Sequence, residues 1–188
     1  MPLDIGIGIF AAIIVSKLFG VELSPLFISA GVVLANLPDL DGVWTFLRNG
    51  NDFKAVSKHR ELIHYPVIYL QVGALAALPF GPEWSVLFLM ASVGHFLHDS
   101  IGIGWGIPWL WPFTNKNYSF IYKYAPRWHT EHPRKLLYAW DRNRMDELVE
   151  RYGDPHWFRN IYLRLHPFFV AELLFFAIAL IALWYVKV

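Results

Sequence analysis

The sequence predicts an all-α fold: a polytopic membrane helical bundle of about five apolar helices, with additional interfacial helices. The chain of 188 residues is 56% hydrophobic and 18% aromatic, with a mean hydropathy of +0.37, which is more apolar than an ordinary soluble domain. Apolar segments of membrane-helix character follow one another along it, and its ionisable residues gather near their ends. The length suits one membrane-embedded domain, residues 1–188.

The apolar segments differ in length and purity. The first two are shorter than the roughly 20 residues of a perpendicular span, and the third is interrupted by His64, Pro66 and Gln71. The fourth ends in the polar sequence GHFLHDS, and the fifth carries one charge, Glu172. The first has neither a basic start nor a cleavage site, so we expect a retained helix rather than a signal peptide. In order, the segments are Ile5–Phe19, Leu23–Leu37, Leu62–Phe80, Trp84–Ile103 and Pro167–Val186.

Two polar stretches, Pro38–Glu61 and Gly104–His166, separate these segments. Within the second, the pattern predicts a solvated helix over Asp141–Tyr152 and a partly interfacial one over Trp157–Leu165. Its first residues include aromatic side chains that suit a membrane–water interface or the rim of a lipid entry: Trp105, Trp109, Trp111 and Phe113.

Positive charge indicates which side the polar stretches face. The first holds four Lys and Arg residues and the second ten. With five spans, both lie on one face together with the N-terminus, and the positive-inside rule makes that face cytoplasmic. The net charge of +1 does not suggest a nucleic-acid partner, and the absence of cysteine excludes disulfides and thiolate metal sites.

Acids and histidines cluster at the cytoplasmic ends of four predicted helices. An ionisable residue at membrane depth is costly and is by default a functional candidate. Random placement would scatter such residues over both faces, so their common depth predicts one shared polar pocket. The candidates are Asp4 at the first helix, Asp39 and Asp41 after the second, His59, Arg60 and His64 before the third, and His95, His98 and Asp99 in the fourth.

The spacing of these residues suits metal binding. His95 and Asp99 are four residues apart and share a helix face, and His98 could join them or face another helix. A set of histidines and carboxylates suits Zn²⁺, and also Mn²⁺ or Fe²⁺. More than four candidate ligands predict more than one divalent ion, as in sites for displacement at phosphorus. Arg60 could pair with a phosphate or neutralise an oxyanion.

Each motif also has a structural interpretation. The sequence PDLD is common at helix ends, and a single histidine in a helix is usually a satisfied core residue. The combination of motifs on four helices favours a site over these separate explanations. We interpret His129 and His132 as part of a solvated or headgroup-facing basic patch, and His156 and His166 as structural.

Three ordered motifs resemble a known family, the bacterial and archaeal inner-membrane-associated proteins assigned as metal-dependent hydrolases, some of them LexA-regulated. These motifs are LPDLD at 37–41, HRELIHY at 59–65 and HFLHD at 95–99, followed by GWGIPWLWPF at 104–113. The resemblance covers about residues 1–115, and the family is distantly similar to zinc-dependent phospholipase C. It implies an inner-membrane location and a metal-dependent hydrolytic activity.

The sequence departs from this family's pattern at three positions. Asp4 stands where the family usually has a histidine, although aspartate also binds metals. Ile63 and Tyr65 replace the Thr and Ser of the family's His-Arg-x-x-Thr-His-Ser box, so any support those residues give the ligands must come from elsewhere. Either change would imply an altered metal preference or lost activity.

The leading interpretation is a membrane-bound, metal-dependent hydrolase whose site faces the cytoplasm and acts on a phosphoester of a lipid or another membrane-borne substrate. One alternative is a non-enzymatic membrane protein with a structural or transport metal site. Another is a scaffold in which the polar cluster only ties helices together. The sequence indicates no oligomeric state. The candidate metal ligands are Asp4, Asp39, His59, His64, His95 and Asp99, and the candidate catalytic residues are Arg60, Asp41 and His98.

Overall fold

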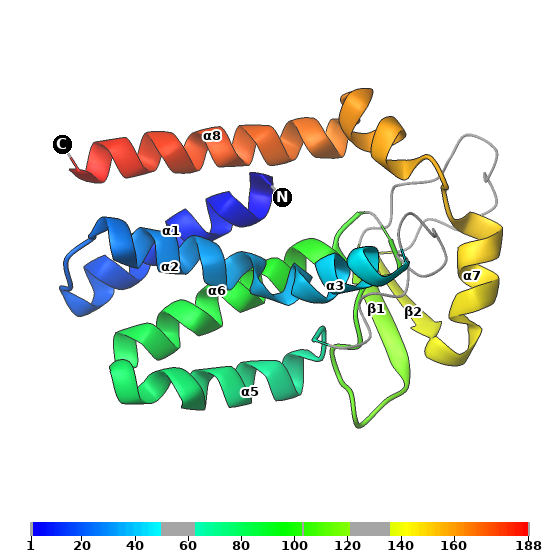
Figure 1. Ribbon diagram of the computed structural model, residues 1–188, viewed down its shortest axis with the longest axis horizontal. Coiled ribbons are helices and arrows are strands. Elements are labelled where there is room, and N and C mark those ends of the chain that lie inside the picture. The colour runs from blue at the N-terminus through cyan, green and yellow to red at the C-terminus, as the bar shows by residue number, and fades with distance from the viewer. Residues whose placement is uncertain (1, 50–62, 103, 121–135, 188) are drawn as a thin grey trace. The chain divides into compact units, whose positions relative to one another are not determined.

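The computed structural model describes residues 2–49, 63–102, 104–120 and 136–187, and most of them are helical (Figure 1). The predicted all-α character therefore holds for most of this part of the chain, but a small sheet was not predicted. The helices are α1 (Pro2–Phe19), α2 (Pro25–Asn36), α3 (Leu40–Asn49), α5 (Pro66–Ala77), α6 (Pro82–Ser100), α7 (Met145–Tyr152) and α8 (Pro167–Lys187). Short helical turns lie at η1 (Leu37–Asp39), η3 (Leu78–Phe80), η4 (Arg142–Arg144) and the π-helical η5 (Arg159–Leu163).

Contacts group the chain into two units. The first consists of Met1–Pro38, Ile68–His98 and Leu165–Val188, and the second of Asp39–Val67 and Asp99–Arg164. Helix α6 belongs to both units, because the boundary falls between His98 and Asp99. The single domain expected over 1–188 stays a prediction.

Proline marks the start of every long apolar helix. Pro2, Pro25, Pro66, Pro82 and Pro167 begin α1, α2, α5, α6 and α8. A proline suits the first helical position because its fixed φ is already helical and the missing N–H would have no partner there. These prolines therefore fix where the helices begin, and so which polar residues lie just before or just inside them.

Helix α1 is the centre of the first unit and packs against α2 and α8. Its buried Ala11, Ala12 and Val15 form a core with Phe27 of α2 and Leu87 of α6. Small residues let these helices approach closely: a Cβ added at Gly8 would lie 2.5 Å from the backbone oxygen of Gly31. This close crossing keeps α1, and with it Asp4, fixed against its neighbours.

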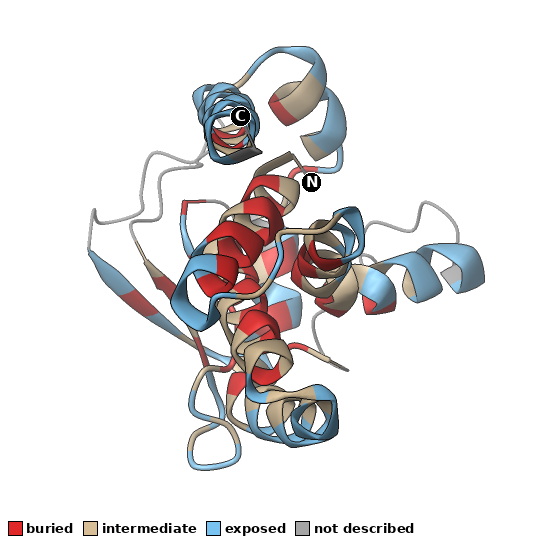
Figure 2. Ribbon diagram, turned by 90° about the vertical axis from the view of Figure 1, so that its left-hand side faces the viewer, coloured by how far each residue is buried: buried red, intermediate tan, exposed pale blue. Residues whose placement is uncertain are grey.

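Three helical segments are long and apolar enough to cross a membrane among the residues that the structure describes: Pro2–Phe19, Pro25–Arg48 and Pro167–Val186. The five apolar helices that we expected are therefore not confirmed. The α5–η3 segment, Pro66–Phe80, is shorter, and polar residues keep α6 outside this class. Most of α8 is exposed (Figure 2), as expected of a helix that faces lipid.

The sequence PDLD does not end the second apolar helix. Leu37–Asp39 form a single 3₁₀ turn, and α3 continues directly from Leu40, so that Pro25–Arg48 is one helical segment of 24 residues. A proline is tolerated here because it stands within a local 3₁₀ turn, where the hydrogen-bond pattern changes. The turn brings Asp39 and Asp41 to the start of α3.

The second unit contains the sheet that the sequence analysis missed. Strands β1 (Lys116–Phe120) and β2 (Leu137–Asp141) pair antiparallel, with Tyr118 opposite Ala139. Asp141 ends β2 and caps η4, where its side chain accepts a hydrogen bond from the Asn143 N–H at 2.9 Å. Helix α7 follows and buries Met145 and Val149, so the predicted helix over Asp141–Tyr152 is observed from Arg142 onward.

Candidate metal centre

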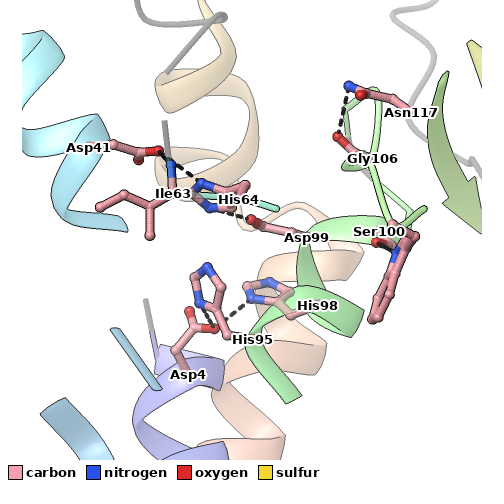
Figure 3. Close-up of polar contacts among 11 residues, drawn as sticks. Asp4, Asp41, Ile63, His64, His95, His98, Asp99, Ser100, Gly106 and Asn117 are labelled. Carbon is pink, nitrogen blue, oxygen red and sulfur yellow. Dashed lines mark hydrogen bonds and ion pairs between the residues drawn. The ribbon is translucent and has the colours of Figure 1, made fainter. Parts of the chain in front are cut away.

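In the second unit, His64 lies between two carboxylates (Figure 3). Its Nδ1 is 2.9 Å from Asp41 Oδ2, and its Nε2 is 3.0 Å from Asp99 Oδ2. The Ile63 N–H donates to the same Asp41 oxygen at 3.4 Å. Asp41 is the second residue of α3, Asp99 is near the end of α6, and His64 lies two residues before Pro66, the first residue of α5.

The surroundings of His64 affect its protonation. Its side chain is fully buried, and burial alone would lower the pKa. The hydrogen bonds and negative charges of Asp41 and Asp99 outweigh burial and raise the pKa of His64 above its ordinary value of 6.5. This imidazole is therefore poised to hold either a proton or, through one ring nitrogen, a cation.

A group of candidate metal ligands surrounds His64. Asp39, His64 and Asp99 each offer one ligand atom, and these atoms lie within 4.8 Å of one another. His95 precedes Asp99 by four residues on α6 and so leaves the same face of that helix. His64 and His95 are almost fully buried.

The donor set fits a divalent transition metal. Two imidazoles and two carboxylates are ordinary ligands of Zn²⁺, and also suit Mn²⁺ or Fe²⁺. The 3.0 Å between His64 Nε2 and Asp99 Oδ2 is close to the roughly 3.3 Å expected of two ligands in a tetrahedral zinc site.

In the first unit, Asp4 is fully buried and lies between two histidines of α6. Its Oδ1 is 3.2 Å from His95 Nδ1 and 3.0 Å from His98 Nδ1 (Figure 3). His95 therefore has Nδ1 engaged by a carboxylate, as His64 does through Asp41. Metal-binding histidines commonly carry such a carboxylate on the nitrogen that does not bind the metal.

Glu172 is the residue of this region that the sequence analysis missed. It lies in the second turn of α8, is 6% exposed, and places Oε1 3.5 Å from His98 Nε2. Two features of the sequence could have indicated Glu172. It is the single charge of the most apolar segment, and it lies near the start of that segment, at the predicted cytoplasmic face where the other acids gather. We noted the charge but did not assign it to the site.

Tyr65, which replaces a serine of the family pattern, contacts an arginine. Arg142 donates from Nη2 to the Tyr65 hydroxyl at 2.9 Å, and its guanidinium lies 5.2 Å from the centre of the Tyr65 ring. Trp111 packs on the same ring, with centroids 4.7 Å apart. This arginine was not among the predicted site residues, because the sheet that precedes it in the chain was not predicted.

The remaining candidates have varied outcomes. His59, Arg60, His129 and His132 lie outside the described residues. His166 accepts a hydrogen bond from the Phe168 N–H at 3.3 Å at the start of α8, and burial lowers its pKa. Two of the four aromatic residues expected at an interface have contacts within the second unit: Trp105 packs against Trp140, and Trp109 donates a hydrogen bond to the Ser100 hydroxyl. Phe113 is largely exposed. His156 is exposed.

The helices and the buried histidine–carboxylate clusters define a helical membrane protein with a candidate metal centre. The sequence pattern of the YdjM inner membrane protein family matches residues 4–187, and the chain belongs to this family. Its expected place in an inner-membrane family is thereby confirmed, whereas a hydrolytic activity and a likeness to phospholipase C are not addressed by the match.

A curated relative supports the same assignment. The chain is 32% identical over 127 residues to the inner membrane protein YbcI of Escherichia coli (strain K12). The aligned region is 63% of this chain and 66% of the relative, just under two thirds of its length. No solved structure matches the chain.

Proposed function

We propose that this protein is a membrane-bound, metal-dependent hydrolase in which Asp39, His64, His95 and Asp99 hold a divalent metal ion. The observation that carries the proposal is the convergence of ligand atoms of Asp39, His64 and Asp99, with His95 one helical turn before Asp99. Zn²⁺ is the first candidate, with Mn²⁺ or Fe²⁺ as alternatives. Bound there, the ion would supply a Lewis acid that polarises a phosphoryl oxygen and activates water.

The chain's own residues would orient and balance this centre. Asp41 accepts from His64 Nδ1 and would present Nε2 to the metal, and Asp4 would do the same for His95. Asp41 and His98, expected in catalysis, would thus support the ligands rather than contact substrate. His59 and a second metal ion remain part of the proposal, since more candidate ligands are present than one ion requires.

The proposed substrate is an anionic phosphoester carried by the membrane. The inner-membrane family and the position of the site residues at the ends of apolar helices support a lipid over a soluble ester. Arg60 and Arg142 are the candidate anion-binding residues; Arg142 is already held against Tyr65, next to His64. A planar guanidinium can contact a phosphate through two N–H groups at once.

A structural metal site is the second candidate function. It is favoured by burial: His64 is 0% and His95 1% exposed, and structural metal sites are closed whereas catalytic ones keep an open position. In that case the ion would tie η1, α6 and the residues before α5 together without turnover. Metal content tests both candidates, and turnover then separates them.

The first experiment is metal analysis by mass spectrometry of protein purified in detergent. We expect close to stoichiometric zinc, manganese or iron in the wild type, strong loss in His95→Ala, and no change in the control His156→Ala, which alters an exposed histidine. A metal-free wild type, or a His95→Ala variant with full metal, would contradict the metal site. Metal-replete protein that releases no phosphate or headgroup from a lipid extract would favour the structural site.

The proposed cytoplasmic orientation has a direct test, because the chain has no cysteine of its own. Single cysteines can be introduced at Lys116 in the long polar stretch and at Glu22 between α1 and α2, both exposed positions. In intact cells, an impermeant thiol reagent should label Glu22→Cys but not Lys116→Cys. The reverse pattern would place the site on the opposite side.

A further inference from the structure

Glu172, His98, Asp4 and His95 form a continuous chain of polar contacts in the first unit, in which only His98 is partly exposed. Glu172 Oε1 is 3.5 Å from His98 Nε2, His98 Nδ1 is 3.0 Å from Asp4 Oδ1, and the same Asp4 oxygen is 3.2 Å from His95 Nδ1. The three helices α8, α6 and α1 supply its members. We infer that Glu172, His98 and Asp4 are positioning residues that hold His95 in the orientation needed to bind the metal.

The contacts decide which ring nitrogens are available. Both nitrogens of His98 face carboxylates, so this ring can satisfy both only by donating from each, and it has no nitrogen left for a metal. His95 faces Asp4 through Nδ1, so Nε2 is the nitrogen that would bind the metal. The two neighbouring histidines of α6 therefore have different roles, and His95 is the one suited to be a ligand.

A single oxygen couples the two histidines. Asp4 Oδ1 lies within 3.2 Å of Nδ1 of both rings (Figure 3), so a change that moves His98 also moves the carboxylate that orients His95. Glu172 holds the far side of His98 and is itself buried, with one carboxylate oxygen that has no hydrogen-bond partner among the described residues. A glutamate on the last apolar helix thus reaches the metal ligand through two intermediates.

This inference rests on the proposed metal site, and Co²⁺ binding separates the two. The visible spectrum of bound Co²⁺ reports ligand geometry, and a titration gives its Kd. We expect Glu172→Leu to weaken Co²⁺ binding by about 10-fold or more and to alter the spectrum, because loss of such outer contacts commonly costs 10–100-fold in metal affinity. Glu172→Gln should bind nearly as the wild type does, since its carboxamide oxygen can take the place of the carboxylate oxygen that faces His98 Nε2.

A double-variant cycle tests whether Glu172 acts through His98. His98→Asn keeps a donor toward Asp4 but cannot reach Glu172, so Glu172→Leu should add little once His98 is Asn. Glu150→Leu makes the same chemical change at an exposed position of α7 and should have no effect. Should Glu172→Leu fail to fold, His98→Asn alone carries the test, with the same expected loss.

The outcomes are distinct. If the wild type binds no Co²⁺, the proposed metal site is wrong and this inference with it. If the wild type binds Co²⁺ and both Glu172→Leu and His98→Asn keep its Kd and spectrum, the metal site stands and the positioning chain is wrong. Additive losses in the double variant would likewise contradict an effect of Glu172 through His98.

Discussion

Asp41→Ala tests whether a carboxylate orients His64. In the structure, Asp41 Oδ2 accepts from His64 Nδ1 at 2.9 Å and from the Ile63 N–H at 3.4 Å. Removing the carboxylate takes away the contact that holds Nδ1 and so selects Nε2 for the metal. Loss of such a partner costs about 10–100-fold in metal affinity, or about 1.4–2.7 kcal/mol.

The same change should destabilise the metal-free protein. A buried donor left without its partner costs about 1–3 kcal/mol, and His64 is fully buried. Asp41→Asn should lose less stability, because its amide oxygen can still accept from His64 Nδ1. Metal affinity is measured by competition with a chromophoric chelator, and stability by thermal unfolding in detergent with EDTA present.

Thr45→Val is the matched control for Asp41. It lies one turn further along α3 and contacts only the backbone oxygen of Asp41, at 2.8 Å. Its metal affinity should equal that of the wild type. If Asp41→Ala binds metal as tightly as the wild type and Thr45→Val, then Asp41 does not orient a ligand; if His64→Ala also retains full affinity, His64 is not a ligand at all.

Three further predictions concern protonation, packing and substrate. Because the folded pKa of His64 is raised above 6.5, the stability that its protonation contributes to the metal-free protein is fully present below about pH 6.5 and is lost as pH rises through the folded pKa. Unfolding in the presence of EDTA should show this loss, and His64→Gln should not show it. Metal affinity should rise over the same pH window. Gly8→Val should lower the unfolding temperature, with an overpacking cost of about 1–3 kcal/mol, because its Cβ would lie 2.5 Å from the Gly31 backbone. Ile14→Ala, on the exposed side of α1, should have a smaller effect, and equal effects of the two changes would contradict this packing. Arg142→Ala should raise KM for a phosphoester and leave bound metal intact, whereas the exposed Arg144→Ala should change neither; metal loss in Arg142→Ala would assign it a structural role.

The apolar helices could be predicted because their signals are local. Long apolar runs and a proline at each start are visible without knowledge of what packs against them. The sheet was missed because β1 and β2 are only five residues each, and a short strand is stabilised mainly by a partner distant in sequence. Five apolar membrane helices are not confirmed: composition alone favours a span over Leu62–Phe80, whereas the described helical segment, Pro66–Phe80, is shorter than a candidate span.

For the site, the sequence predicted which residues gather but not what each one contacts. Common depth at the helix ends was enough to propose Asp39, His64 and Asp99 together. The contacts of Asp4 and Asp41 with Nδ1 atoms depend on ring orientations, which no spacing in the sequence specifies. Glu172 could not be assigned to the site without the rotation of α8 about its own axis, since one charge on an apolar helix can face either lipid or protein.

Charge balance explains why a cation suits the polar cluster of the second unit. In the first unit, His98 lies between Asp4 and Glu172, so an imidazolium there offsets one of two negative charges. In the second, three carboxylates, those of Asp39, Asp41 and Asp99, gather about His64. A proton on His64 offsets one of the three, whereas a divalent cation with His64 neutral offsets two. Buried carboxylates are costly unless compensated, so exchange of the His64 proton for a metal ion brings this cluster closer to neutrality. Metal binding should therefore release a proton from His64 and rigidify the acids around it, which is the electrostatic reason to expect an ion there rather than a self-sufficient hydrogen-bonded network.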